Sequence, residues 1–146
     1  MVPLEELKKY CEGKKIIIVG NSSRILNDNY KKLIDNYEIV VRINKGYLHR
    51  QNLYSDKIGS KTNILSLGLK SASFSANIIQ SNTVNYIISP IIYSERLDYS
   101  NVYNVDRETY NTLKLELGGF KPSTGISTYN FFNRHINFSR LDLIGF

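Results

Sequence analysis

The sequence predicts an α/β fold, a Rossmann-like three-layer sandwich whose sheet is mostly parallel. Strand-like apolar runs alternate along the chain with segments of helical periodicity, at the spacing of βαβ units. Runs such as KIIIV are apolar without alternation, which is typical of strands covered on both faces. The chain has 146 residues, 42% of them hydrophobic, and this length suits one domain with a single core.

The first expected elements are a short helix and a buried strand. The helix, over residues 3–12, places Leu4 and Leu7 on one side, and Gly13 supplies a C-terminal stop. The strand covers residues 15–19, where the KIIIV run lies.

A βαβ unit follows from the next segments. Apolar side chains fall on one face of a helix over residues 27–36, and the run EIVVRI predicts a second strand over residues 38–43. Strand, helix and strand at this spacing form a right-handed crossover. The polar segment 45–61 is predicted to be a long loop, and loops of this length are often functional.

The second half of the chain continues the alternation. Strands are predicted over residues 63–67 (NILSL) and 86–89 (YIIS), with a helix over residues 71–80 between them. Asp106 is placed to cap a helix over residues 107–117. The remaining expected elements are a helix over residues 126–135 and a strand over residues 141–144.

Two polar turns have the composition of anion sites. Gly20 permits close approach of a ligand after the first strand, and the side chains of Asn21 and Ser22 are able to hydrogen-bond ribose or phosphate oxygens. The backbone amides of this turn are expected to be free to face a ligand. The second turn, Ser123-Thr124-Gly125, precedes a predicted helix and therefore lies at its positive dipole end.

Each turn alone has a simpler interpretation, as a strand-to-helix turn or as an N-cap. The first turn lacks the later glycines of the dinucleotide fingerprint, and it lacks the Gly-Lys-Ser/Thr of a P-loop. In an open parallel sheet, however, both turns fall at the carboxyl edge of the strands, where ligands bind. The pair therefore predicts one site.

Longer stretches around these turns resemble a known family. KIIIVGNSSRI, LIDNYEIVVRIN and DKIGSKTNIL follow one another within residues 15–65, and they resemble the large sialylmotif of eukaryotic-type sialyltransferases. PSTGISTYNFFNRHINFSRLDLIGF, which begins at Pro122, resembles the small sialylmotif. Bacterial sialyltransferases share a looser version of both motifs.

The resemblance implies a sialyltransferase-like variant of the GT-A fold and a glycosyltransferase activity. The implied reaction is the inverting, metal-independent transfer of sialic acid from CMP-sialic acid to a sugar hydroxyl. The expected partners are thus a CMP-sugar donor and a glycan acceptor, with no cofactor, and the chain has neither Asp-x-Asp nor a His/Cys cluster with metal-ligand spacing. The residues that the resemblance assigns to the donor nucleotide are Gly20, Asn21, Ser22, Asn44, Ser123, Thr124 and Gly125.

Four further motif positions are expected to be structural. Arg42 and Asp35 match the large motif, and we predict that they form an ion pair or anchor a loop. Gly59 and Thr62 match its last element and are predicted to be turn and packing residues.

The cysteine pattern favours a reducing compartment. The family joins its two motifs by a disulfide, and Ile16 and Phe138 stand at the corresponding positions of this chain, where Cys11 is the single cysteine. The N-terminus, MVPLEELKKY, has acidic residues where an export signal is basic and apolar. No apolar run approaches the about 20 residues of a membrane span. We therefore expect a cytoplasmic protein without a transmembrane segment.

The catalytic base is the part of the family pattern that the sequence lacks. The family places its general-base histidine after the small motif, and this sequence ends at Phe146. We expect residues 1–146 to form a single nucleotide-sugar-binding domain that either is a minimal transferase or lacks the family's C-terminal catalytic segment. Within the chain, the candidate catalytic residue is His49 in the predicted loop, with His135 and Asp56 as alternatives.

The net charge favours an anionic partner. Nineteen basic and 13 acidic residues give a formal charge of +6. The basic residues are scattered pairs without interleaved aromatic side chains, so nucleic acid is not an expected partner. Three hypotheses stay open on the sequence: a sialyltransferase; a non-catalytic cytidine-nucleotide-binding protein or CMP-sugar hydrolase; and a basic interaction protein that retains only the fold.

Overall fold

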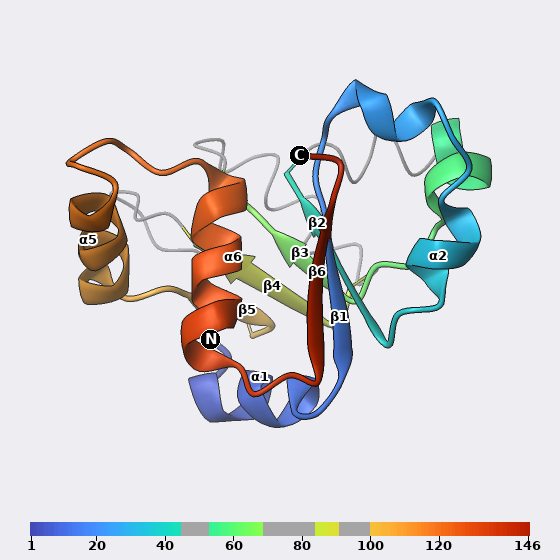
Figure 1. Ribbon diagram of the computed structural model, residues 1–146. Coiled ribbons are helices and arrows are strands. Elements are labelled where there is room, and N and C mark those ends of the chain that lie inside the picture. The colour runs from blue at the N-terminus through green and yellow to red at the C-terminus, as the bar shows by residue number, and fades with distance from the viewer. Residues whose placement is uncertain (45–52, 69–83, 91–99) are drawn as a thin grey trace.

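The structure is a computed structural model that describes residues 1–44, 53–68, 84–90 and 100–146. Its strands in these ranges are β1 (Lys15–Val19), β2 (Ile39–Ile43), β3 (Ile64–Ser66), β4 (Tyr86–Ser89), β5 (Val102–Asn104) and β6 (Arg140–Ile144). They form one sheet in the order β5-β4-β3-β2-β1-β6, and every neighbouring pair is parallel (Figure 1). The predicted α/β fold with a mostly parallel sheet is therefore confirmed.

Helices cover both faces of this sheet. The described helices are α1 (Leu4–Cys11), the 3₁₀ helix η1 (Ser23–Leu26), α2 (Lys31–Asp35), α5 (Arg107–Glu116), α6 (Thr124–His135) and a helical segment at residues 53–58. α1 and α6 pack on one face, whereas η1, α2 and the 53–58 segment pack on the other (Figure 1). Of the helices in the described ranges, none is long and apolar enough to cross a lipid bilayer.

The central strand β1 shows why its sequence is apolar without alternation. Ile16 and Ile18 belong to the core on the side of α1 and α6, whereas Ile17 and Val19 belong to the core on the side of η1 and α2. All four side chains are at most 3% exposed. β1 lies between β2 and β6, so both of its faces and both of its edges are covered.

Cys11 is a core residue. Its side chain is fully buried where α1 packs against the sheet. Burial raises the pKa of the Cys11 thiol to about 12, so the thiol stays protonated at neutral pH.

One predicted helix is shorter in the structure than the sequence indicates. Of the predicted residues 27–36, only α2 is an α-helix, and it follows the separate 3₁₀ helix η1. Asn29 explains part of the break, because its Oδ1 accepts a hydrogen bond from the backbone amide of Lys31 at 3.1 Å. Asn and Asp side chains that bond nearby backbone amides in this way compete with helical hydrogen bonds.

Two other predictions also need correction. The predicted loop over residues 45–61 contains the helical segment 53–58, and β5 is a strand that the sequence pattern does not predict. β5 has only three residues, too few for periodicity to reveal it. The predicted helix over residues 71–80 lies outside the described residues. The other expected elements agree with the structure within two residues at each end.

Arg42 anchors the segment that leads into β3. Its side chain is 2% exposed, and its guanidinium donates hydrogen bonds to the backbone oxygens of Ile58 at 2.9 Å, Gly59 at 3.1 Å and Lys61 at 3.1 Å. Asp35 supports the same segment, because its Oδ1 accepts from the amide of Lys61 at 3.2 Å. As predicted from the motif, both side chains anchor a loop.

Gly59 is required at this anchor by its backbone. Its φ is +70°, and a Cβ built there would lie 2.2 Å from Oδ1 of Asp35. The large motif therefore joins a buried arginine, a carboxylate and a glycine into one structural unit.

We expect Arg42→Met to lower the free energy of unfolding by about 2–4 kcal/mol, because three backbone carbonyl oxygens, two of them buried, lose a charged donor. Urea denaturation measures the change. Arg24→Met is the matched control, since Arg24 is exposed on η1, and its stability should stay within about 0.5 kcal/mol of the wild type. Equal stability of both variants would show that the guanidinium does not hold this segment.

Candidate functional site

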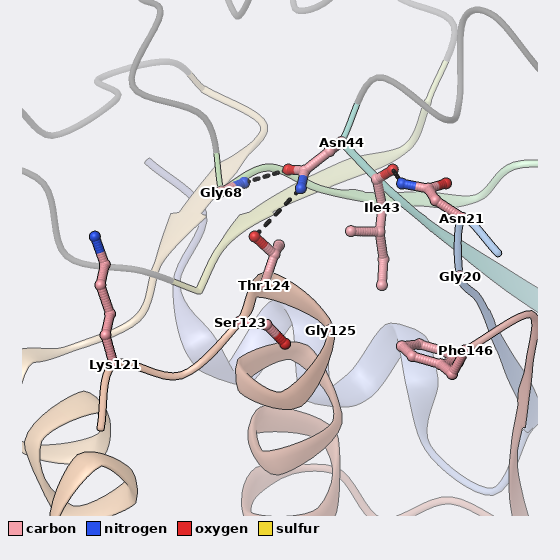
Figure 2. Close-up of a pocket in the computed structure, with 10 residues that line it drawn as sticks. All are labelled: Gly20, Asn21, Ile43, Asn44, Gly68, Lys121, Ser123, Thr124, Gly125 and Phe146. Carbon is pink, nitrogen blue, oxygen red and sulfur yellow. Dashed lines mark hydrogen bonds between the residues drawn. The ribbon is translucent and has the colours of Figure 1, made fainter. Parts of the chain in front are cut away.

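A pocket of about 470 Å³ opens at the carboxyl edge of the sheet. The ends of β1 and β2, the residue Gly68 after β3, the N-terminus of α6 and Phe146 surround it (Figure 2). It lies where the strand order changes direction, because β1 is followed by β2 on one side while β6 joins it on the other. Open α/β sheets bind ligands at such a position. Six of the seven residues assigned to the donor line this pocket: Gly20, Asn21, Asn44, Ser123, Thr124 and Gly125.

The end of β1 is packed tightly against the end of β6. The amide of Gly20 donates to the oxygen of Ile144, and the amide of Ser22 donates to the oxygen of Gly145, both at 2.8 Å. A Cβ on Gly20 would lie 2.3 Å from the Gly145 oxygen. The prediction that the amides of this turn are free to face a ligand is thus wrong for Gly20 and Ser22, whose amides hold β6 in place.

The side chains of the first turn have different roles. Asn21 is exposed, and its Nδ2 donates to the backbone oxygen of Ile43 at 3.0 Å, which ties the end of β1 to the end of β2. Ser22 caps η1, because its Oγ accepts from the amide of Arg24 at 3.4 Å, and it is not among the described residues that line the pocket. A contact of Ser22 with a donor stays a prediction.

Asn44 joins three segments of the pocket. Its Nδ2 donates to Oγ1 of Thr124 at 3.2 Å, and its Oδ1 accepts from the amide of Gly68 at 2.7 Å (Figure 2). The backbone of Asn44 has a φ of 51°, in the left-handed region that asparagine tolerates better than most residues. A Cβ on Gly68 would lie 1.9 Å from Oγ1 of Thr124, so glycine is required for this close approach.

The N-terminus of α6 supplies the other wall. Ser123 is the N-cap, and its Oγ accepts from the amide of Ile126 at 3.3 Å. Thr124 and Gly125 form the first turn of the helix, whose amides have no carbonyl partner within the helix. Gly125 leaves room for Phe146, because a Cβ there would lie 2.5 Å from Cε1 of that ring.

A buried hydroxyl pair fixes this turn of α6 to the sheet. Oγ of Ser66, at the end of β3, lies 2.6 Å from Oγ1 of Thr128, and the Thr128 hydroxyl donates to the backbone oxygen of Thr124 at 2.6 Å. Both Ser66 and Thr128 are fully buried. The N-terminus of α6 is therefore held rigidly beside the ends of β2 and β3, as an anion site requires.

Four described lining residues were not assigned from the sequence: Ile43, Gly68, Lys121 and Phe146. Gly68 follows the third predicted strand, and Lys121 and Phe146 stand at the two ends of the small motif. These residues could therefore have been predicted from the sequence, because each lies next to a predicted strand or to a motif segment assigned to the site. Among the ten described residues that line the pocket, Lys121 has the only charged side chain.

None of the candidate bases lies in the described part of the pocket. His49, the predicted catalytic residue, lies outside the described residues. Asp56 is exposed in the 53–58 helical segment and does not line the pocket. His135 lies at the far end of α6, where its Nε2 is 3.3 Å from Oγ1 of Thr109.

His135 belongs to a different surface. It lines a groove of about 620 Å³ beside α1, together with Glu5 and Lys8. Burial lowers the pKa of His135 below its ordinary value, although Asp106 acts in the opposite direction. Among the residues that the structure describes, no three His, Cys, Asp or Glu side chains gather as a metal site would.

Comparison with known proteins relates this fold to one family. Residues 5–105 match Glycosyltransferase family 29 (sialyltransferase). A stretch of 47 residues is 49% identical to the Beta-1,6-galactosyltransferase GALT29A of Arabidopsis thaliana, and it covers 32% of this chain and 11% of that protein. Two crystal structures of a mammalian sialyltransferase are similar over the whole chain, one of them in complex with Gal-beta-1-3GalNAc-ortho-nitrophenol.

The structural similarity defines the class of fold. The two sialyltransferase structures give TM-scores of 0.68 and 0.67 at 19% and 20% sequence identity, so the domain has the α/β fold of that glycosyltransferase class. The family match covers more than half of the chain, and the chain belongs to glycosyltransferase family 29, the sialyltransferase family. It spans 59% and 60% of the chains of those two structures and 11% of the curated relative.

We expect Asn44→Ala to lower the free energy of unfolding by about 1–3 kcal/mol, because two hydrogen bonds are lost and alanine disfavours a positive φ. Asn21→Ala, at an exposed residue with one hydrogen bond, should cost about 0.5 kcal/mol. Chemical denaturation measures both values. Asn44→Gly separates the two causes at Asn44, since glycine accepts the backbone conformation. If Asn44→Gly is as stable as the wild type, the side-chain amide does not hold the three segments together.

Proposed function

We propose that this protein is a sialyltransferase-like glycosyltransferase and that the pocket holds the cytidine nucleotide of its donor, CMP-sialic acid. The observation that carries the proposal is the hydrogen bond of 3.2 Å between Asn44 and Thr124 in the pocket. Asn44 ends the second strand of the large motif and Thr124 begins the helix of the small motif. Two segments that the family resemblance assigns to one nucleotide therefore meet at one point.

The chemistry of the pocket suits a phosphate and a ribose. The first-turn amides of α6 at Thr124 and Gly125 and the partial positive charge of the helix N-terminus favour an anion. The side-chain amides of Asn21 and Asn44 lie opposite as further hydrogen-bonding groups (Figure 2). Gly20 and Gly125 also line the pocket, and their lack of a side chain lets Gly145 and Phe146 pack closely against this wall.

In the proposed reaction, an acceptor hydroxyl attacks the anomeric carbon of the bound sialic acid. The bond between this carbon and the phosphate oxygen breaks, and CMP leaves with the electron pair. The proton of the hydroxyl passes to a base, and the candidate for that base within this chain is His49, assigned from the sequence. From the family resemblance, we propose that the transfer needs no metal.

A second candidate donor follows from the similarity to a galactosyltransferase. The matched stretch of that plant protein is 49% identical, whereas the sialyltransferase structures are 19% and 20% identical over the whole chain. Transfer of galactose is therefore the alternative that an assay has to separate from transfer of sialic acid. For the acceptor, we propose a glycan that ends in galactose, like the disaccharide bound in one of the sialyltransferase structures.

The test is an assay of nucleotide release. The full chain is incubated with CMP-sialic acid or UDP-galactose, with and without Gal-beta-1-3GalNAc, in buffer that contains EDTA. We expect release of CMP that depends on the acceptor. Release without acceptor would indicate a hydrolase, and binding without release a nucleotide-binding protein. Preference for UDP-galactose would indicate the second candidate, and binding of neither donor would leave an interaction protein that retains only the fold.

A variant localises the reaction to the pocket. We expect Asn21→Asp to lower the turnover of CMP-sialic acid about tenfold, because a carboxylate in the lining repels the donor phosphate. Asn133→Asp, at an exposed position on α6 outside the lining, makes the same change of charge and should retain the wild-type rate. Equal rates for the two variants would place the donor elsewhere.

A further inference from the structure

The pocket has a single described cation, and the motif pattern gives it no role. Lys121 lines the pocket, whereas the other nine described lining residues have uncharged side chains. A nucleotide carries at least one negative charge on its phosphate, and a pocket that removes this charge from water has to compensate for it. Among the described lining residues, the groups that compensate for the negative charge of the phosphate are the N-terminus of α6 and the ammonium of Lys121.

We infer that Lys121 pairs with the phosphate of the bound nucleotide and so makes the pocket selective for a nucleotide over its nucleoside. The inference rests on the proposed function, because it concerns the same pocket, and it assigns a specificity-determining residue to it. Through its charge, Lys121 discriminates ligands that share base and ribose but differ in the phosphate.

The local backbone holds Lys121 beside the helix terminus. Lys121 precedes Pro122, a buried residue, and Ser123 is the N-cap of α6. A residue before proline is restricted to extended conformations, so Lys121 does not continue into the helix. Figure 2 shows its side chain extended along the direction of the α6 axis, at the side of the pocket away from Gly20 and Phe146. The side chain of Lys121 and the first turn of α6 both line the pocket.

The ammonium of Lys121 is not engaged by the rest of the described protein. Other cations have partners there, for example Arg134 with Glu116 and Arg140 with Asp142. Lys121 forms neither an ion pair nor a hydrogen bond with any residue of the described ranges. A cation that already has an internal partner gains less from a phosphate, so Lys121 is the lining group with the most to gain.

The test compares the affinities of CMP and cytidine for the full chain by titration calorimetry at low and high salt. Lys121→Gln removes the charge and keeps a side chain of similar length. The matched control is Lys114→Gln, because Lys114 is exposed on the neighbouring helix α5 and does not line the pocket. UMP and uridine form a second pair of ligands, which covers a uridine-based donor.

We expect Lys121→Gln to weaken the binding of CMP about tenfold, and to leave the binding of cytidine unchanged. High salt should weaken CMP binding to the wild type more than to this variant, because the removed contact is an ion pair. Lys114→Gln should behave as the wild type, and Lys121→Arg should retain most of the affinity.

The outcomes separate this inference from the proposed function. If the wild type binds CMP and Lys121→Gln binds it equally well, the role of Lys121 is overturned and the donor pocket stands. The role of Lys121 is also overturned if Lys121→Gln weakens the binding of cytidine as much as the binding of CMP. If UMP binds in place of CMP and its binding depends on Lys121 in the same way, the inference stands. The proposed nucleobase of the donor, cytosine, is then wrong. If the wild type binds none of the four ligands, the inference and the proposed function both fail.

Discussion

The pocket of this protein depends on the side-chain amide of Asn44. One amide group receives a hydrogen bond from Gly68 after β3 and donates one to Thr124 at the start of α6. These segments are far apart in the sequence, and nothing else in the described pocket joins all three so directly. The positive φ of Asn44 turns the chain at the end of β2 so that its amide reaches both partners. The site therefore exists only in the folded chain.

Many residues in and beside the two motifs have a structural role. Gly20, Gly59, Gly68 and Gly125 each stand where a Cβ would lie within 2.5 Å of another atom. Arg42 holds the segment before β3 by donating hydrogen bonds to its backbone oxygens. The hydroxyl pair of Ser66 and Thr128 holds α6 against the end of β3. Gly20, Gly68 and Gly125 line the pocket, and the groups that remain for a ligand are the first-turn amides of α6 and the side chains of Asn21, Asn44 and Lys121.

The sequence predicts the layers and most elements, because four of the five residues in β1 and in β2 are apolar and Asp106 and Ser123 are recognisable caps. It predicts six of the ten described residues that line the pocket, since parallel strands bring their carboxyl ends together. What it misses depends on three-dimensional contacts. The amides of Gly20 and Ser22 look free in a turn, but they donate to the oxygens of Ile144, at the end of β6, and Gly145, over 100 residues later. In the sequence, nothing distinguishes Lys121 from the other lysines, and only the folded structure shows that it lines the pocket.

The most direct test of the account is a titration of CMP into isotope-labelled protein, followed by the backbone amide signals in NMR spectra. A nucleotide in the proposed pocket shifts the signals of Asn21, Asn44, Thr124 and Gly125, which line it from both motifs. The signals of Lys8 and His135, in the groove beside α1, should not move. Shifts confined to that groove, or no shifts at saturating CMP, would contradict the assignment of the nucleotide to the carboxyl edge of the sheet.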